Sequence, residues 1–247
     1  MKLRLAAALL FVSHILLAQN LLESYHLLGV DDNVDYNIRI DEELAKDIVS
    51  FHTDGNVLTI YGVRQIDTII THLDKFLEVK FVVRGGTGVK NRVKVLLCVD
   101  NGKIFTSLLI DSDVESRVTE VYDKVADSLK LFDEEEQYHV LISIAEKAGG
   151  FVATLTESNY VRSKYDPSSN TSSKEVFRLN FDESGHYFFN SSKNLNNRYR
   201  VYSYKENSYS EKLISTEAPA VELQYGIYFF IDGMWYAEGR DNILFYR

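Results

Sequence analysis

Short runs of β-branched and aromatic residues, separated by Gly, Asn and Asp, constrain this chain more than any other feature of its sequence. Four such runs lie close together, at residues 57–61, 79–83, 92–99 and 104–110. Residues of this kind suit the pleated surface of a β-sheet, and the Gly and Asn residues between them suit tight turns. We therefore expect an antiparallel meander at the centre of the fold. An Asp54–Gly55 turn predicts a hairpin before it, and residues 138–144 and 151–156 predict a further hairpin.

Two segments instead repeat apolar residues with the period of an α-helix, which predicts one buried face for each. In residues 63–77 the repeating residues are Ile66, Ile69, Ile70, Leu73, Phe76 and Leu77. In residues 113–131 they are Val114, Val118, Val121, Tyr122, Val125 and Leu129. Ser112 and Glu115 have the spacing of a capping box at the start of the second segment. Shorter helices are expected at residues 20–30 and 41–48.

The small polar residues at 166–174 predict a linker, and beyond them no helical period remains. The expected organisation is a leader at residues 1–18, an α+β domain at 19–165, the linker at 166–174 and a β-rich C-terminal unit at 175–247. The fold class that we expect is α+β. An antiparallel or mixed sheet carries two covering amphipathic helices, and an all-β antiparallel unit follows it.

The first residues have the composition of a secretory signal peptide. Lys2 and Arg4 precede an apolar stretch at residues 5–17, and Ala18 supplies a small residue at the expected cleavage point. We therefore expect a secreted, periplasmic or extracellular protein, cleaved after about Ala18. No later stretch has the roughly 18 consecutive apolar residues of a membrane span. Cys98 is the only cysteine, so the mature chain can form no intramolecular disulfide.

The charge balance argues against nucleic acid as a partner. The chain has 27 basic and 36 acidic residues, and removing Lys2 and Arg4 with the leader leaves 25 against 36, a net charge of about −11. Such a surface repels phosphate backbones. The expected partner is instead a protein or a glycan.

One segment resembles an EF-hand calcium loop. Four oxygen-bearing residues occupy positions 1, 3, 5 and 12 of such a loop: Asp31, Asn33, Asp35 and Glu42. Tyr36 stands where the loop requires glycine, and Arg39 places a positive charge at position 9. The residues read equally well as a polar segment that continues into an alternating strand. We therefore expect no cofactor, with weak calcium binding as the one possibility.

No catalytic motif is recognisable, so the catalytic residues are unknown. The histidines after the leader are scattered, and His186, close to Asp182 beside a turn, is predicted to be solvated surface. The leading interpretation is a secreted, non-enzymatic binding protein. The alternative is an extracytoplasmic hydrolase whose His and acidic residues assemble only in the fold. The expected ligand surface is an exposed aromatic patch that includes Tyr228 and Trp235 or Tyr236.

Overall fold

The computed structural model describes residues 24–83, 89–123, 128–182, 185–239 and 242–246, and within them nearly every segment is a β-strand. The N-terminal sheet has the order β1-β2-β3-β4: β1 (Ser24–Leu28), β2 (Asp35–Glu43), β3 (Ile48–Thr53) and β4 (Asn56–Tyr61). The central sheet has the order β12-β11-β10-β9-β8-β7-β6-β5: β5 (Val63–His72), β6 (Phe76–Val83), β7 (Val89–Asp100), β8 (Lys103–Asp123), β9 (Ser128–Lys147), β10 (Gly150–Ser163), β11 (Thr171–Phe181) and β12 (Phe188–Phe189).

The third sheet is a closed barrel: β13 (Ser191–Ser203), β14 (Ser208–Glu222), β15 (Ile227–Ile231), β16 (Met234–Glu238) and β17 (Ile243–Tyr246). The helical elements in the described residues are two single 3-10 turns, η1 (Leu44–Lys46) and η2 (Pro167–Ser169). The expected α+β class is therefore wrong. No helix in the described part of the chain has the length and apolar character needed to cross a membrane.

The first predicted helix is strand β5, and its apparent helical period comes from two β-bulges. The pairing of β5 with β6 shifts register after Val63 and again after Ile66. Each bulge adds one residue to β5, so residues three positions apart return to the same face of the strand. Val63, Ile66 and Ile69 thereby lie opposite buried residues of β6. Leu73, expected in the buried stripe, lies exposed in the turn that follows.

The second predicted helix is also wrong. Residues 113–123 belong to β8 and residues 128–131 to β9, while residues 124–127 lie outside the described part of the chain. The expected cap is absent, because the Ser112 hydroxyl donates to the carbonyl of Arg92 and to the carboxylate of Asp113. This part of β8 pairs with β7 as far as Ser116 and with β9 as far as Asp123, and valines suit such a paired strand.

The short predicted helices fail as well, whereas the hairpins are confirmed. Residues 24–28 of the first segment form β1, and the second segment contains the end of β2 and η1. The meander is confirmed as β6, β7 and β8. The Asp54–Gly55 turn joins β3 to β4 as expected, and β9 pairs with β10. Local turn chemistry therefore predicted the strand connections better than apolar spacing predicted the element type.

Three layers of strands pack together in the part of the molecule that we call the body. They are the N-terminal sheet, a middle layer that contains β6 and β7, and a layer that contains β10 and β11. Phe81 and Phe76 point to opposite faces of β6 because their positions in the strand differ by five, an odd number. Phe81 packs edge-to-face on Phe51 of the N-terminal sheet. On the other face, Phe76 contacts Phe151 of β10 and Phe181 of β11. The middle layer is therefore covered on both faces, which explains why β6 and β7 are buried almost without alternation.

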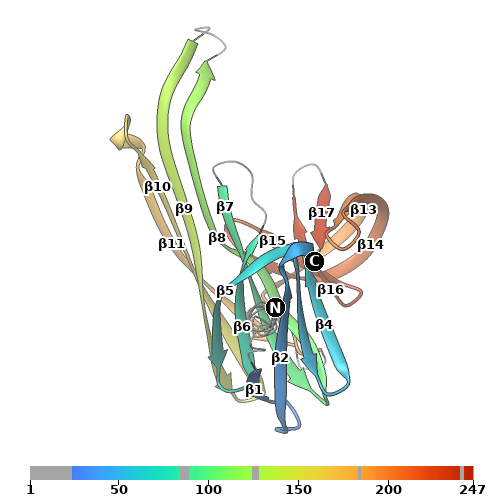
Figure 1. Ribbon diagram of the computed structural model, residues 1–247. Coiled ribbons are helices and arrows are strands. Elements are labelled where there is room, and N and C mark those ends of the chain that lie inside the picture. Colours follow the sequence, from blue (N-terminus) through green and yellow to red (C-terminus); the bar gives the residue numbers. More distant parts are fainter. Residues whose placement is uncertain (1–23, 84–88, 124–127, 183–184, 240–241, 247) are drawn as a thin grey trace, which may run out of the picture.

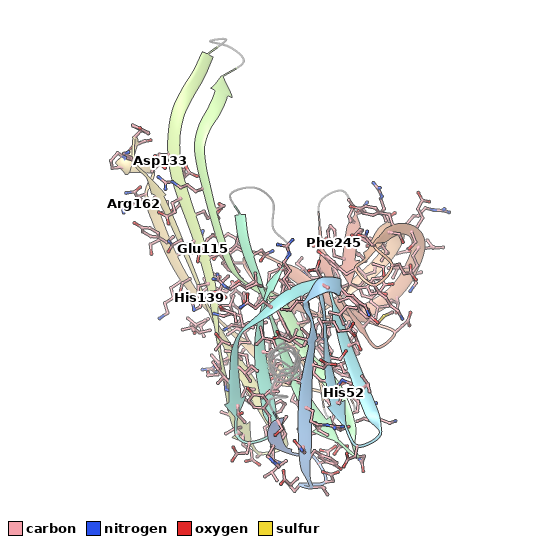
Figure 2. The ribbon with its side chains drawn as sticks, in the orientation of Figure 1. His52, Glu115, Asp133, His139, Arg162 and Phe245 are labelled. Atoms are coloured by element: carbon pink, nitrogen blue, oxygen red, sulfur yellow. The ribbon has the colours of Figure 1, made fainter. Side chains whose placement is uncertain are left out.

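Strands β8 and β9 also extend beyond the body as a long hairpin, which we call the arm (Figure 1). They pair only from Asp113 and His139 outward, and below these residues they separate into different layers. Figure 2 shows Asp133 of β9 and Arg162 of the neighbouring strand β10 farther from the body than Glu115 and His139. Among the arm residues whose side chains the structure describes, 113–117 and 133–139, most are charged.

The predicted linker does not separate two units. Residues 166–174 contain η2 and the start of β11, which pairs with β10 along its length, so the stretch is a hairpin connection inside the central sheet. The change of sheet comes between β12 and β13. The C-terminal residues 191–246 are β-structure as expected, but the pairing is not all antiparallel, because β13 and β17 run parallel and close the barrel.

Candidate functional site

The expected exposed aromatic patch is wrong, because its three aromatic residues are buried. Tyr228, Trp235 and Tyr236 expose only 3%, 2% and 2% of their surface. The barrel packs against the body, so the β15–β16 hairpin is covered on both faces. Tyr228 and Trp235 join the core of the body, and Tyr236 joins the core of the barrel. No described face of this hairpin leaves two of these rings open to a partner.

The residues of the EF-hand-like segment do not converge on one point. Asp35 and Glu42 lie near opposite ends of the extended strand β2. The side chain of Glu42 accepts a hydrogen bond from the backbone of Ile66, and that of Asn33 accepts one from Lys75. Asp35 lies 3.3 Å from His26. An extended strand cannot wrap an ion, so these four residues do not form a calcium loop.

Asp31 instead meets two residues that are distant in the sequence. The Nε2 atom of His186 lies 3.1 Å from Oδ2 of Asp31 and 3.3 Å from Oδ2 of Asp100. All three potential ligand atoms lie within 4.8 Å of one another. Asp31 follows β1, Asp100 ends β7 and His186 precedes β12, so three connections at one end of the body bring the cluster together. We call this end of the body the loop end.

The carboxylate of Asp100 is the fixed member of the cluster. Its side chain is only 6% exposed. One oxygen accepts hydrogen bonds from the backbone N–H groups of Asp31 and Asp32, and the other accepts one from the side chain of Asn101. These bonds hold the carboxylate in one orientation, as outer hydrogen bonds do around a metal ligand.

The imidazole of His186 is positioned by packing. Its ring stacks on Phe105 at 4.5 Å between ring centres, with the planes 11° apart. Its backbone has a φ of +68°, a left-handed conformation that few residues other than glycine and asparagine adopt readily. The carbonyl of His186 also lies 3.9 Å from the thiol of Cys98. Burial raises the pKa of that thiol to about 12, so Cys98 stays neutral and does not join the cluster as a thiolate.

Negative charge exceeds positive charge around this cluster. Among the described residues, no lysine or arginine lies within ion-pair distance of Asp31 or Asp100, and His186 is the one basic side chain that does. Nearby, hydrogen bonds from the Tyr36 hydroxyl and the Val34 backbone lower the pKa of Asp32, which adds a third carboxylate. The amine of Lys75 donates to the carbonyls of Gly29 and Val30 and to Asn33 instead. A buried carboxylate in such surroundings favours a bound cation.

A cavity of about 470 Å³ opens beside the cluster. Asp31, Lys75 and Glu146 supply its charged lining, and the rings of Phe151 and Phe181 supply apolar surface. Asp31 therefore belongs both to the cluster and to the cavity. This position gives the cluster access to solvent and to a ligand.

The three possible ligand atoms, one imidazole nitrogen and two carboxylate oxygens, suit a divalent cation that binds both nitrogen and oxygen ligands. Such an ion lies about 2.0–2.2 Å from each ligand atom. This fits the separations of 3.1 Å and 3.3 Å between His186 and the two carboxylates. One imidazole and two carboxylates suit Zn²⁺ or Mn²⁺, whereas Ca²⁺ takes about six to eight oxygens. Three protein ligands leave coordination positions open.

Comparisons with models of protein families, with curated proteins and with solved structures found no match to this chain. The site is therefore defined by its own geometry. Of its members, the sequence predicted only Asp31 as a possible metal ligand, although in a different arrangement. His186 was predicted to be solvated surface, and the only signal for Asp100 was its place before an Asn-Gly turn.

Proposed function

We propose that this chain is a non-enzymatic binding protein that acts outside the cytoplasm, and that its binding site is a divalent cation held at the loop end. Asp31, Asp100 and His186 are the protein ligands. Open positions on the ion then accept carboxylate or hydroxyl oxygens of a protein or glycan partner. The observation that carries this proposal is the convergence of one imidazole and two carboxylates from three distant segments.

Titration with Zn²⁺ and with Mn²⁺ in a calorimeter tests this proposal. We expect one binding site per chain in the wild type. His186→Asn should weaken binding at least about tenfold, because it removes the nitrogen ligand while asparagine tolerates the left-handed backbone there. The Tm of the wild type should rise when metal is added, and the Tm of His186→Asn should rise less.

The chain offers a matched control for this experiment. His26 and Asp35 form an exposed His–carboxylate pair on the N-terminal sheet, with the same chemistry but no third ligand among the residues that the structure describes. His26→Asn should leave the affinity unchanged. The proposal fails if neither ion binds, or if His26→Asn weakens binding as much as His186→Asn.

A hydrolase is the second candidate, and one observation favours it. Glu146 lines the same cavity as Asp31, where a carboxylate can take a proton from a metal-bound water. Zn²⁺-dependent hydrolysis of p-nitrophenyl acetate, abolished by Glu146→Gln while metal affinity persists, would establish catalysis. No turnover above that of the Zn²⁺ buffer would leave binding as the function.

A further inference from the structure

A second cavity, of about 230 Å³, lies where the barrel meets the body, away from the loop end. Strand β4 and strand β8 supply one side of it, and β16, β17 and the β13–β14 connection supply the other. Its lining is largely apolar and includes Leu58, Ile60, Tyr61, Leu109, Trp235 and Tyr246. We call it the junction cavity.

The inner lining of the junction cavity is rigid and apolar. Ile60, Leu109 and Trp235 expose only 2%, 3% and 2% of their surface. The indole N–H of Trp235 already donates to the carbonyl of Thr106, at 2.6 Å. The tryptophan therefore offers its ring carbons to the cavity and keeps no free donor. A ligand here gains affinity from apolar contact with a surface that is already ordered.

The outer lining contains one positive charge. Lys205, in the exposed connection between β13 and β14, lies with its amine 5.8 Å from the centre of the Tyr61 ring. No carboxylate of the described residues lies within ion-pair distance of this amine, although the chain as a whole is acidic. An unpaired ammonium group beside an apolar cavity complements an anion attached to an apolar body.

We propose that the junction cavity binds a small carboxylic acid, with its apolar body against Trp235 and Leu109 and its carboxylate against Lys205. The cavity is smaller than the roughly 300–1,000 Å³ of drug-sized sites. The ligand is therefore a short acid whose apolar end enters the cavity while its carboxylate stays at the outer lining. This site is independent of the cation proposed at the loop end and shares no residue with it.

Tryptophan fluorescence of the full chain tests this inference directly, because Trp235 is the only tryptophan and lines the cavity. The probes are hexanoate and the uncharged hexan-1-ol, each titrated to about 10 mM. Hexanoate should produce a saturable change in the emission of Trp235. Hexan-1-ol should bind at least about tenfold more weakly, because it lacks the carboxylate that pairs with Lys205.

Lys205→Gln should weaken hexanoate binding about tenfold and leave hexan-1-ol binding unchanged. The matched control is Lys103→Gln, which removes another exposed lysine, at the start of β8, that does not line the junction cavity. Both variants change only exposed side chains, so both should fold. The inference is overturned if hexanoate gives no saturable change, if hexan-1-ol binds equally well, or if the two variants behave alike.

Discussion

The body and the arm share the same two strands, β8 and β9, yet their ion pairs lie in opposite surroundings. In the body, Glu78 and Lys94 lie 2.8 Å apart with side chains only 3% and 6% exposed. On the arm, Arg117 and Asp133 form a two-point contact in which the arginine side chain is 63% exposed. The Asp133 side chain is 15% exposed, so this pair is solvated on its arginine side, whereas both members of the body pair are buried.

The buried pair is completed by two further groups. Lys94 also donates to the carbonyl of Val140, which ties the middle layer to β9. His72 lies 2.8 Å from the other oxygen of Glu78. Burial opposes ionisation of Glu78, but the His72 hydrogen bond and the charge of Lys94 together hold its pKa below the ordinary value. The layers are thus joined by polar contacts as well as by apolar packing.

The largest effect is expected from Lys94→Met, which leaves Glu78 buried without its cation and Val140 without its donor. Breaking a buried pair in this way costs about 3–5 kcal/mol of unfolding free energy. Urea unfolding measures the loss. The double variant Glu78→Leu/Lys94→Met serves as the control, and it should recover most of the stability because no buried charge remains. Equal losses in both proteins would contradict this account.

An intermediate effect is expected from pH. Because the folded pKa of Glu78 lies below its unfolded value of about 4.3, its ionised form stabilises the fold above that pH. This contribution is lost as the pH falls through the folded pKa. The stability difference between the wild type and Glu78→Gln should therefore be largest near neutrality and shrink in acid. Urea midpoints at several pH values check it, and a constant difference would argue against it.

The smallest effect is expected from Asp133→Asn on the arm. The hydrogen bond from Arg117 lowers the pKa of Asp133 too, but solvent reaches the pair through the arginine, which is 63% exposed, and screens it. The urea midpoint should not change measurably at physiological salt. A shift as large as that of Lys94→Met would show that the arm and the body are not different in the way described.

The sequence predicted the strand connections because turn residues act locally. The Asp54–Gly55 hairpin and the meander of β6, β7 and β8 followed from such residues. It did not predict β5, because two bulges turn a period of two into a period of three. Nothing in one sequence marks a bulge, so the helix interpretation was the natural one.

The candidate site was less accessible to sequence reasoning than the fold. Asp31 and His186 are 155 residues apart and meet only because β1, β7 and β11 all end at the loop end. The burial of Trp235 likewise depends on the barrel packing against the body, which no local pattern reveals. Residues of this kind become visible only when the topology is known.

The parallel pairing of β13 with β17 has a consequence for the order of folding. These are the first and last strands of the barrel, and their partners are about 43 residues apart in the sequence, as Arg200 and Ile243 show. The hairpins within the barrel form from residues that are close in the sequence. Closure instead requires the chain between β13 and β17 to lose conformational entropy before their contacts can form. Barrel closure is therefore a late event, and until it occurs β13 presents an unpaired edge to other chains.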